Sequence, residues 1–97
     1  MNKKIDLQLA IALCFAFREH THTRVRPDGS SENEYKDTMI SFGTQDQFLC
    51  LTTVLNDTLY GFYPDAIVFK VDDSSPITDG ELAELEGHLK NILNELE

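Results

Sequence analysis

The sequence predicts an α+β domain with an N-terminal helix, an antiparallel β-meander of four to five short strands, and a C-terminal amphipathic helix packed on the sheet. Three observations carry this prediction. An apolar run opens the chain, short apolar segments separated by turn residues fill its middle, and a leucine stripe with helical spacing closes it. A length of 97 residues is typical of a single compact domain, which we expect to span residues 1–97.

The C-terminal segment 76–97 has the clearest pattern. Its large apolar residues recur at steps of three and four, so a helix places them on one stripe that must be covered. Thr78 and Glu81 have the spacing of a capping box, and Ile77 can pack on Leu82 as a hydrophobic staple. The stripe consists of Leu82, Leu85, Leu89, Ile92 and Leu96. We expect solvent on the opposite face, which carries Glu81, Glu84, His88, Asn91 and Glu95.

The N-terminal segment 5–17 fits two patterns. Large apolar residues occupy its odd positions, which is the alternation of a strand, but its Ala, Leu and Gln residues favour a helix. We expect a helix from Lys4 to Phe17 and then a strand from His20 to Arg26, although the first segment could also be a strand. As a helix it would be apolar all round, so it should lie buried between other layers or at an interface.

Turn residues divide the middle of the chain. The stretch 27–34 is rich in Pro, Asp, Gly, Ser and Asn, residues 43–47 form a second predicted loop, and Asn56-Asp57 suits a two-residue hairpin turn. Gly61 indicates a bulge or a close approach of another segment. The predicted strands that follow the first one are 35–42, 48–55, 58–63 and 66–71.

Acidic residues are concentrated in the second half of the chain, and the net charge is −9. Residues 1–48 carry six basic and seven acidic side chains, whereas residues 49–97 carry two basic and ten acidic ones, a net charge of −8. Direct nucleic-acid binding is disfavoured, because phosphate contacts need Lys and Arg. A protein with a basic surface is the favoured partner, since an acidic face attracts it. The alternative is that the acidity serves solubility alone.

Two groups of residues are candidates for partner binding. The first lies in the aromatic segment 59–64, whose side chains either pack in the core or contact a partner, and its candidates are Tyr60 and Tyr63. The second is the acidic surface before and along the C-terminal helix. Its candidates are Asp72, Asp73, Asp79, Glu81, Glu84, Glu86 and Glu95.

No catalytic motif is present, and we expect no enzyme activity, no cofactor and no metal site. His20 and His22 share one face of the predicted strand, but they supply two metal ligands where three or four are needed. With Arg24 and Arg26 they form a basic stripe, which acidic residues across the predicted hairpin can neutralise. Those acidic residues are Glu32, Glu34 and Asp37.

The cysteines and the N-terminal run bear on the location of the protein. Cys14 and Cys50 lie in apolar runs, where a cysteine packs as a small core residue, so we expect reduced thiols and a cytoplasmic protein. The run 7–17 is too short to span a bilayer and no cleavage site follows it. We therefore expect it to belong to the fold and expect no contact with a membrane.

These observations favour a small acidic protein-binding module without catalysis. By analogy of charge alone, an inhibitor, an immunity protein or an anti-defence protein can cover the basic, nucleic-acid-binding surface of its target with such carboxylates. The alternative is a structural subunit that forms a homo-oligomer, such as a homodimer, through its apolar helix surfaces. A third hypothesis, an enzyme or small-ligand receptor, requires an apolar pocket that holds a histidine or carboxyl with a strongly shifted pKa.

Overall fold

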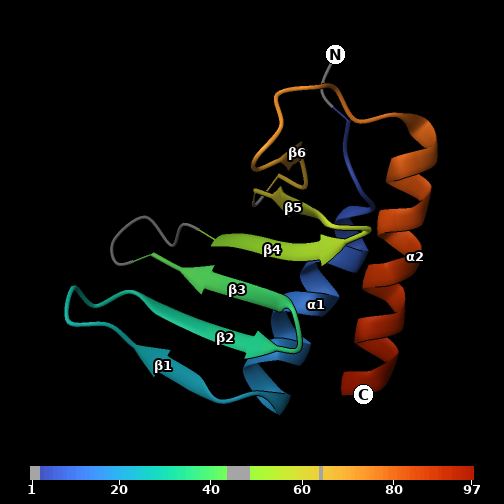
Figure 1. The fold of residues 1–97 in the computed structure, drawn as a ribbon. Coiled ribbons are helices and arrows are strands. Elements are labelled where there is room, and N and C mark those ends of the chain that lie inside the picture. Colours follow the sequence, from blue (N-terminus) through green and yellow to red (C-terminus); the bar gives the residue numbers. More distant parts are fainter. Residues whose placement is uncertain (1–2, 44–48, 64) are drawn as a thin grey trace.

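The computed structural model describes residues 3–43, 49–63 and 65–97. Within them, a six-stranded antiparallel sheet lies between two helices in the sequence, and its strands neighbour one another in chain order (Figure 1). The helices are α1 (Leu7–His20) and α2 (Asp79–Leu96). The strands are β1 (Thr23–Val25), β2 (Ser31–Tyr35), β3 (Thr38–Phe42), β4 (Leu49–Leu55), β5 (Thr58–Phe62) and β6 (Val68–Lys70). The predicted α+β architecture is confirmed.

Side chains of the same sheet face bond to both helices, and Figure 1 shows α1 behind the sheet and α2 beside it. The Asn33 amide of β2 donates to the Phe17 carbonyl of α1 at 3.0 Å, and the Thr53 hydroxyl of β4 lies 3.0 Å from the His88 Nε2 atom of α2. We call this the covered face; the core lies between it and the helices. Its buried strand residues are Asn33, Thr38, Ile40, Leu51, Thr53, Tyr60, Phe62 and Val68. The opposite face, which neither helix covers, is the open face.

The start and the stripe of α2 are as predicted. The Thr78 hydroxyl accepts from the Glu81 N–H and the Glu81 carboxylate accepts from the Thr78 N–H, both at 3.1 Å, which completes the capping box. Leu85, Leu89, Ile92 and Leu96 are buried, and Leu82 is half-buried. The prediction of a solvated opposite face is wrong for Glu81 and His88, because both are half-buried and bond to side chains of the sheet.

The bounds of α1 are shifted from the predicted 4–17 to Leu7–His20. Lys4 forms a β-bridge with Ile67, so the chain is still extended there. The Asp6 carboxylate then caps the helix by accepting from the Gln8 N–H at 3.0 Å. At the other end, the helix includes His20, which was predicted to begin the first strand. Strand β1 is limited to Thr23–Val25.

One side of α1 is buried and the other faces solvent. The buried side consists of Leu9, Ala10, Leu13, Ala16 and Phe17. Leu7, Ile11 and Phe15 lie four residues apart on the opposite side and are 48%, 41% and 59% exposed. The predicted burial of this helix between other layers is therefore wrong; the alternative, an interface with another protein, stays a prediction. We call these three residues the α1 row.

The sheet has six strands instead of four to five because β2 occupies part of the predicted turn 27–34. Its side chains are polar, which hides the strand in the sequence. Glu32 and Glu34 stand on the open face, while Asn33 turns into the core. The tight turn to β3 is at Lys36-Asp37, and Lys36 adopts a φ of 53°.

The predictions for the Asn56-Asp57 turn and for Gly61 are confirmed. Asn56 and Asp57 have φ values of 52° and 61° in the turn between β4 and β5. Gly61 marks a close approach, because a Cβ there would lie 2.7 Å from the Phe69 ring. Most of the predicted loop 43–47, the residues Phe48 and Pro64, and the burial of the Cys50 side chain lie outside what the structure describes.

Asn33 ties the end of α1 to the sheet. Its Nδ2 atom donates to the Phe17 carbonyl and to the Thr21 hydroxyl, both at 3.0 Å, and its Oδ1 atom accepts from the Thr23 hydroxyl at 3.2 Å. The residue is 1% exposed. Because a buried amide costs free energy unless it is hydrogen-bonded, these bonds fix the position of α1 on β1 and β2.

Candidate protein-binding surfaces

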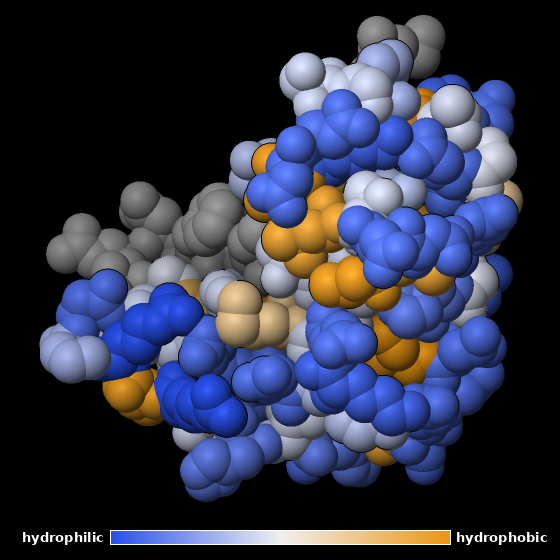
Figure 2. All heavy atoms as spheres, in the orientation of Figure 1, coloured by the Kyte–Doolittle hydropathy of each residue, from blue (hydrophilic) through white to orange (hydrophobic). Residues whose placement is uncertain are grey.

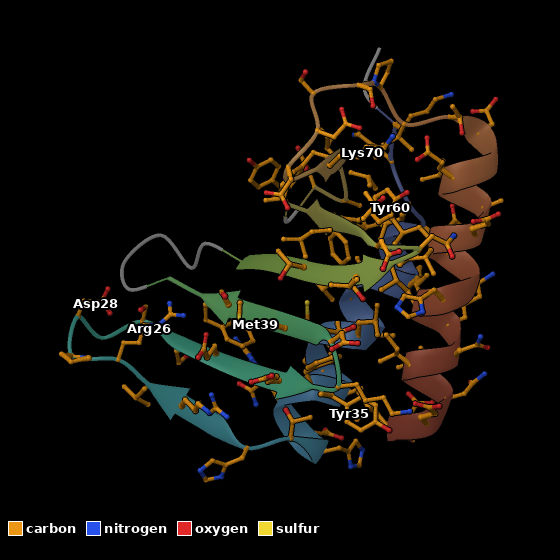
Figure 3. The ribbon with its side chains drawn as sticks, viewed as in Figure 1. Arg26, Asp28, Tyr35, Met39, Tyr60 and Lys70 are labelled. Atoms are coloured by element: carbon orange, nitrogen blue, oxygen red, sulfur yellow. The ribbon has the colours of Figure 1, made fainter. Side chains whose placement is uncertain are left out.

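Glu81 serves the fold. Its carboxylate accepts from the Lys70 ammonium and from the Tyr60 hydroxyl, each at 2.9 Å, in addition to the capping bond with Thr78. The Lys70 hydrogen bond, then the Thr78 and Tyr60 bonds, lower the pKa of Glu81 from 4.5 to about 2. Tyr60 and Lys70 both lie on the side of the sheet that α2 approaches (Figure 3). Glu81, which was predicted to contact a partner, therefore joins α2 to β5 and β6.

Three more of the predicted carboxylates bond to side chains of distant segments. Asp79 forms an ion pair with Lys3, and Glu95 forms one with Lys36 at 2.9 Å. Glu84 accepts from the Asn56 amide at 3.0 Å. These contacts lower the pKa of Asp79 through the Lys3 hydrogen bond and that of Glu95 through the Lys36 hydrogen bond. Two lysines from the first half of the chain thus reduce the net charge of −8 in residues 49–97 to −6.

The other predicted carboxylates form no ion pair with a described residue. Asp73 is exposed, and the Ser75 N–H bonds to its carboxylate at 2.9 Å, which lowers the pKa of Asp73. Asp72 is exposed and Glu86 is half-buried, and neither forms an ion pair with another described residue. The unneutralised part of the predicted acidic surface is therefore the β6–α2 loop and the side of α2 that carries Glu86.

The two tyrosines of the aromatic segment differ: one packs in the core and the other is exposed. Tyr60 is 4% exposed and belongs to the core, where burial and the Glu81 bond raise its pKa. Tyr63 is 41% exposed, and its ring stacks on Phe69 with 4.6 Å between centroids and 25° between planes. Of the two candidates, Tyr63 is the one placed where a partner can reach it.

The basic stripe is largely neutralised inside the molecule. Arg24 pairs with Glu34 at 3.5 Å and Arg26 pairs with Glu32, as predicted for this hairpin. The third predicted acid, Asp37, forms no ion pair with the described residues. A search of the described chain found no group of three His, Cys, Asp or Glu side chains that could hold a metal ion. Cys14 is a half-buried free thiol whose pKa is raised by burial.

Two hollows bear on the enzyme hypothesis. One of about 320 Å³ lies beside β6 and includes Lys3, Phe69 and Asp73 in its lining. The other, of about 250 Å³, lies between the β2–β3 turn and α2 and includes His88 and Glu95. Glu81, with the strongly lowered pKa, lines neither of them, and its shift follows from a structural ion pair. The hypothesis of a catalytic carboxyl gains no support from this geometry.

The α1 row was not named among the candidate residues, although the sequence contains its signal. Its members are every second residue of the alternating apolar series, so on a helix they fall four residues apart. A buried helix side accounts for the other large residues of that series. The row is therefore an apolar surface that the internal packing of the described chain leaves exposed.

Comparison of the chain with protein-family models, with curated proteins and with solved structures found no match. The described helices include none that is both long and apolar enough to cross a membrane. The surfaces of the described residues are therefore the features that bear on function.

Proposed function

We propose that this protein is a non-enzymatic binding module that attaches to the basic surface of another protein in the cytoplasm. The observation that carries the proposal is the acidity left after the internal ion pairs are formed, a net charge of −6 over residues 49–97 and the two lysines that pair with them. A basic groove that normally holds nucleic-acid phosphates is a suitable target, because carboxylates can occupy its phosphate sites. By analogy of charge alone, an inhibitor, an immunity protein or an anti-defence protein can act in this way.

The arrangement of the charges favours association with a basic protein. Asp72 and Asp73 are exposed and adjacent, and neither forms an ion pair with another described residue. Unpaired surface carboxylates of this kind speed the encounter with a basic partner and set its orientation. Such attraction weakens as salt shortens the Debye length, which is about 8 Å at physiological ionic strength.

The test is capture of partners from a cell lysate on the immobilised protein, with elution in steps of rising salt and identification by mass spectrometry. We expect one basic, nucleic-acid-handling protein that is released by raised salt. An Asp72→Asn/Asp73→Asn variant should release it at lower salt, whereas Glu19→Gln on α1 serves as a control for charge removed elsewhere. Release that does not depend on salt, or capture of no basic protein, contradicts the proposal.

A second candidate function, self-association, is favoured by the α1 row. Three large side chains that are 41–59% exposed on one helix side form an apolar surface of the kind that a second copy can cover. Two copies of a chain with charge −9 repel each other, but α1 itself carries one basic and one acidic side chain, Arg18 and Glu19. The α1 side is thus an approach with little charge repulsion.

Sedimentation equilibrium tests this second function. The wild-type protein should show a reversible dimer, and Phe15→Glu should shift it to the monomer because a carboxylate in the apolar contact loses its water. Asn94→Glu, on an exposed position of α2, is the matched control and should leave the dimer in place. A wild-type protein that stays monomeric at high concentration excludes self-association.

A further inference from the structure

The open face of the sheet carries an apolar patch that crosses four strands. Alternation along the strands places Met39 of β3, Thr52 of β4, Gly61 of β5 and Phe69 of β6 on this face, and their register aligns them in one transverse row. The Phe69 ring lies against Gly61, where a Cβ would approach it to 2.7 Å. The Phe69 ring therefore covers Gly61, and the first row is apolar at both ends.

A second transverse row lies beside the first. Val54 of β4 is paired with Leu59 of β5, and the Val71 N–H donates to the Leu59 carbonyl at 2.9 Å. Val54 and Val71 are 41% and 43% exposed. We call Met39, Val54, Leu59, Phe69, Val71 and the stacked Tyr63 the open-face patch. Figure 3 labels Met39 on the face turned to the viewer, and Figure 2 shows apolar side chains on that face over β3 to β6.

The rim of the open-face patch is acidic. The β3–β4 register continues to place Asp37 opposite Val54 at one end of the second row, and Asp72 follows Val71 in the loop after β6. Asp57 lies in the turn that joins Val54 to Leu59, and Asp65 lies two residues after Tyr63. All four aspartates are exposed, and none forms an ion pair within the described parts of the chain.

An apolar centre with an acidic rim favours one kind of binding partner. A second copy of the chain would bring another four aspartates against these four, and like charges opposed in an interface cost free energy. A basic segment with apolar side chains matches both the rim and the centre. Four strands at a spacing of about 4.8 Å span roughly 14 Å, which suits a single helix or strand of a partner. Arginine fits best, since its guanidinium can stack on an aromatic ring such as that of Tyr63 while it pairs with a carboxylate.

We propose that the basic partner docks on the open-face patch through one arginine-bearing segment with alternating apolar side chains. This proposal rests on the proposed function, because it takes the partner to be basic, and it specifies where and by which chemistry the partner binds. The β6–α2 loop takes part through Asp72, whereas the α2 side that carries Glu86 stays outside the contact.

The probe is a short synthetic peptide of alternating arginine and leucine with blocked termini, titrated into the isotopically labelled protein and followed by amide chemical shifts at low salt. We expect shifts at Met39, Leu59 and Phe69. Two variants compare the surfaces with equal changes of charge: Asp37→Lys/Asp72→Lys at the rim, and Glu86→Lys/Glu97→Lys on α2 and its C-cap. The rim variant should bind about tenfold more weakly, and the α2 variant should change the affinity by less than about twofold.

Each of the other outcomes contradicts either the docking site or the basic-partner function. If the α2 variant loses binding and the rim variant keeps it, the open-face docking is wrong while the basic-partner function stands. Equal losses in both variants, or equal affinity for a peptide of alternating arginine and serine, show attraction without use of the apolar patch and also overturn it. If the wild-type protein does not bind the arginine–leucine peptide at all, the basic-partner function falls together with the docking site.

Discussion

The two helices of this molecule have similar inward sides, which are apolar and buried, but they differ in their outward sides. Both lie on the covered face of the sheet and contact each other, and both bury a row of large apolar side chains. On its outward side α2 carries Glu84, Lys90, Asn91 and Asn94, as expected for a helix at a surface. The outward side of α1 carries the α1 row instead. Packing within the domain accounts for the large apolar residues of α2 but not for Leu7, Ile11 and Phe15, and contact of that row with another protein is our proposal.

The largest expected contrast between the helices concerns stability. Leu89 of α2 is 0% exposed, so Leu89→Ala should lower the free energy of unfolding by about 2–5 kcal/mol. Ile11 of α1 is 41% exposed, so Ile11→Ala should cost less than about 1 kcal/mol. Urea denaturation followed by circular dichroism measures both values. Similar losses would remove the distinction between an inward side that folds the domain and an outward side that does not.

A smaller effect tests how α1 is held. Asn33→Ala removes the amide that bonds to the Phe17 carbonyl and the Thr21 hydroxyl, which should cost about 1–3 kcal/mol. Asn94→Ala on the outward side of α2 is the control and should change stability by less than about 0.5 kcal/mol. Amide hydrogen exchange should also speed up in the last turn of α1 in the Asn33 variant. Unchanged protection there would show that packing alone fixes the helix.

The pH dependence of stability tests the attachment of α2. The pKa of Glu81 is lowered from 4.5 to about 2, chiefly by Lys70, so its ionised form stabilises the fold above pH 4.5 and this contribution is lost as the pH falls toward 2. Glu81→Gln should therefore be less stable than the wild type at neutral pH, and the difference should vanish near pH 2. Chemical denaturation from pH 2 to 7 measures it, with Glu86→Gln as the control for charge lost elsewhere. A difference that is constant with pH would contradict the role of the ion pair.

The same comparison explains which parts of the fold the sequence predicts. The stripe of α2 has one interpretation, because its spacing matches a helix and its cap is specific: Thr78 and Glu81 form the expected bonds. The α1 segment has two interpretations, because apolar residues on both sides of a helix imitate the alternation of a strand. Strand β2 is not predicted from its own residues, because its polar side chains bond to other segments. Their partners are Arg24, Arg26 and the end of α1.

The candidate site is predictable only in part, for a related reason. The surplus of acidic residues is visible in the composition, but the internal partners of Glu81, Asp79 and Glu95 come from β6, the N-terminal segment and the β2–β3 turn. Sequence reasoning cannot separate these carboxylates from Asp72 and Glu86. Alternation places Phe69 and Val71 on one side of a strand, but only the packing of the helices decides that this side is open.

One measurement tests most directly whether the outward side of α1 serves binding instead of folding. A Leu7→Gln/Ile11→Gln/Phe15→Gln variant and the wild-type protein are unfolded in urea at low protein concentration, where self-association contributes least. We predict a loss of less than about 2 kcal/mol for the three changes together, because these side chains are 48%, 41% and 59% exposed in the isolated domain. A loss as large as that of Leu89→Ala would show that the row belongs to the core and would contradict its assignment to contact with another protein.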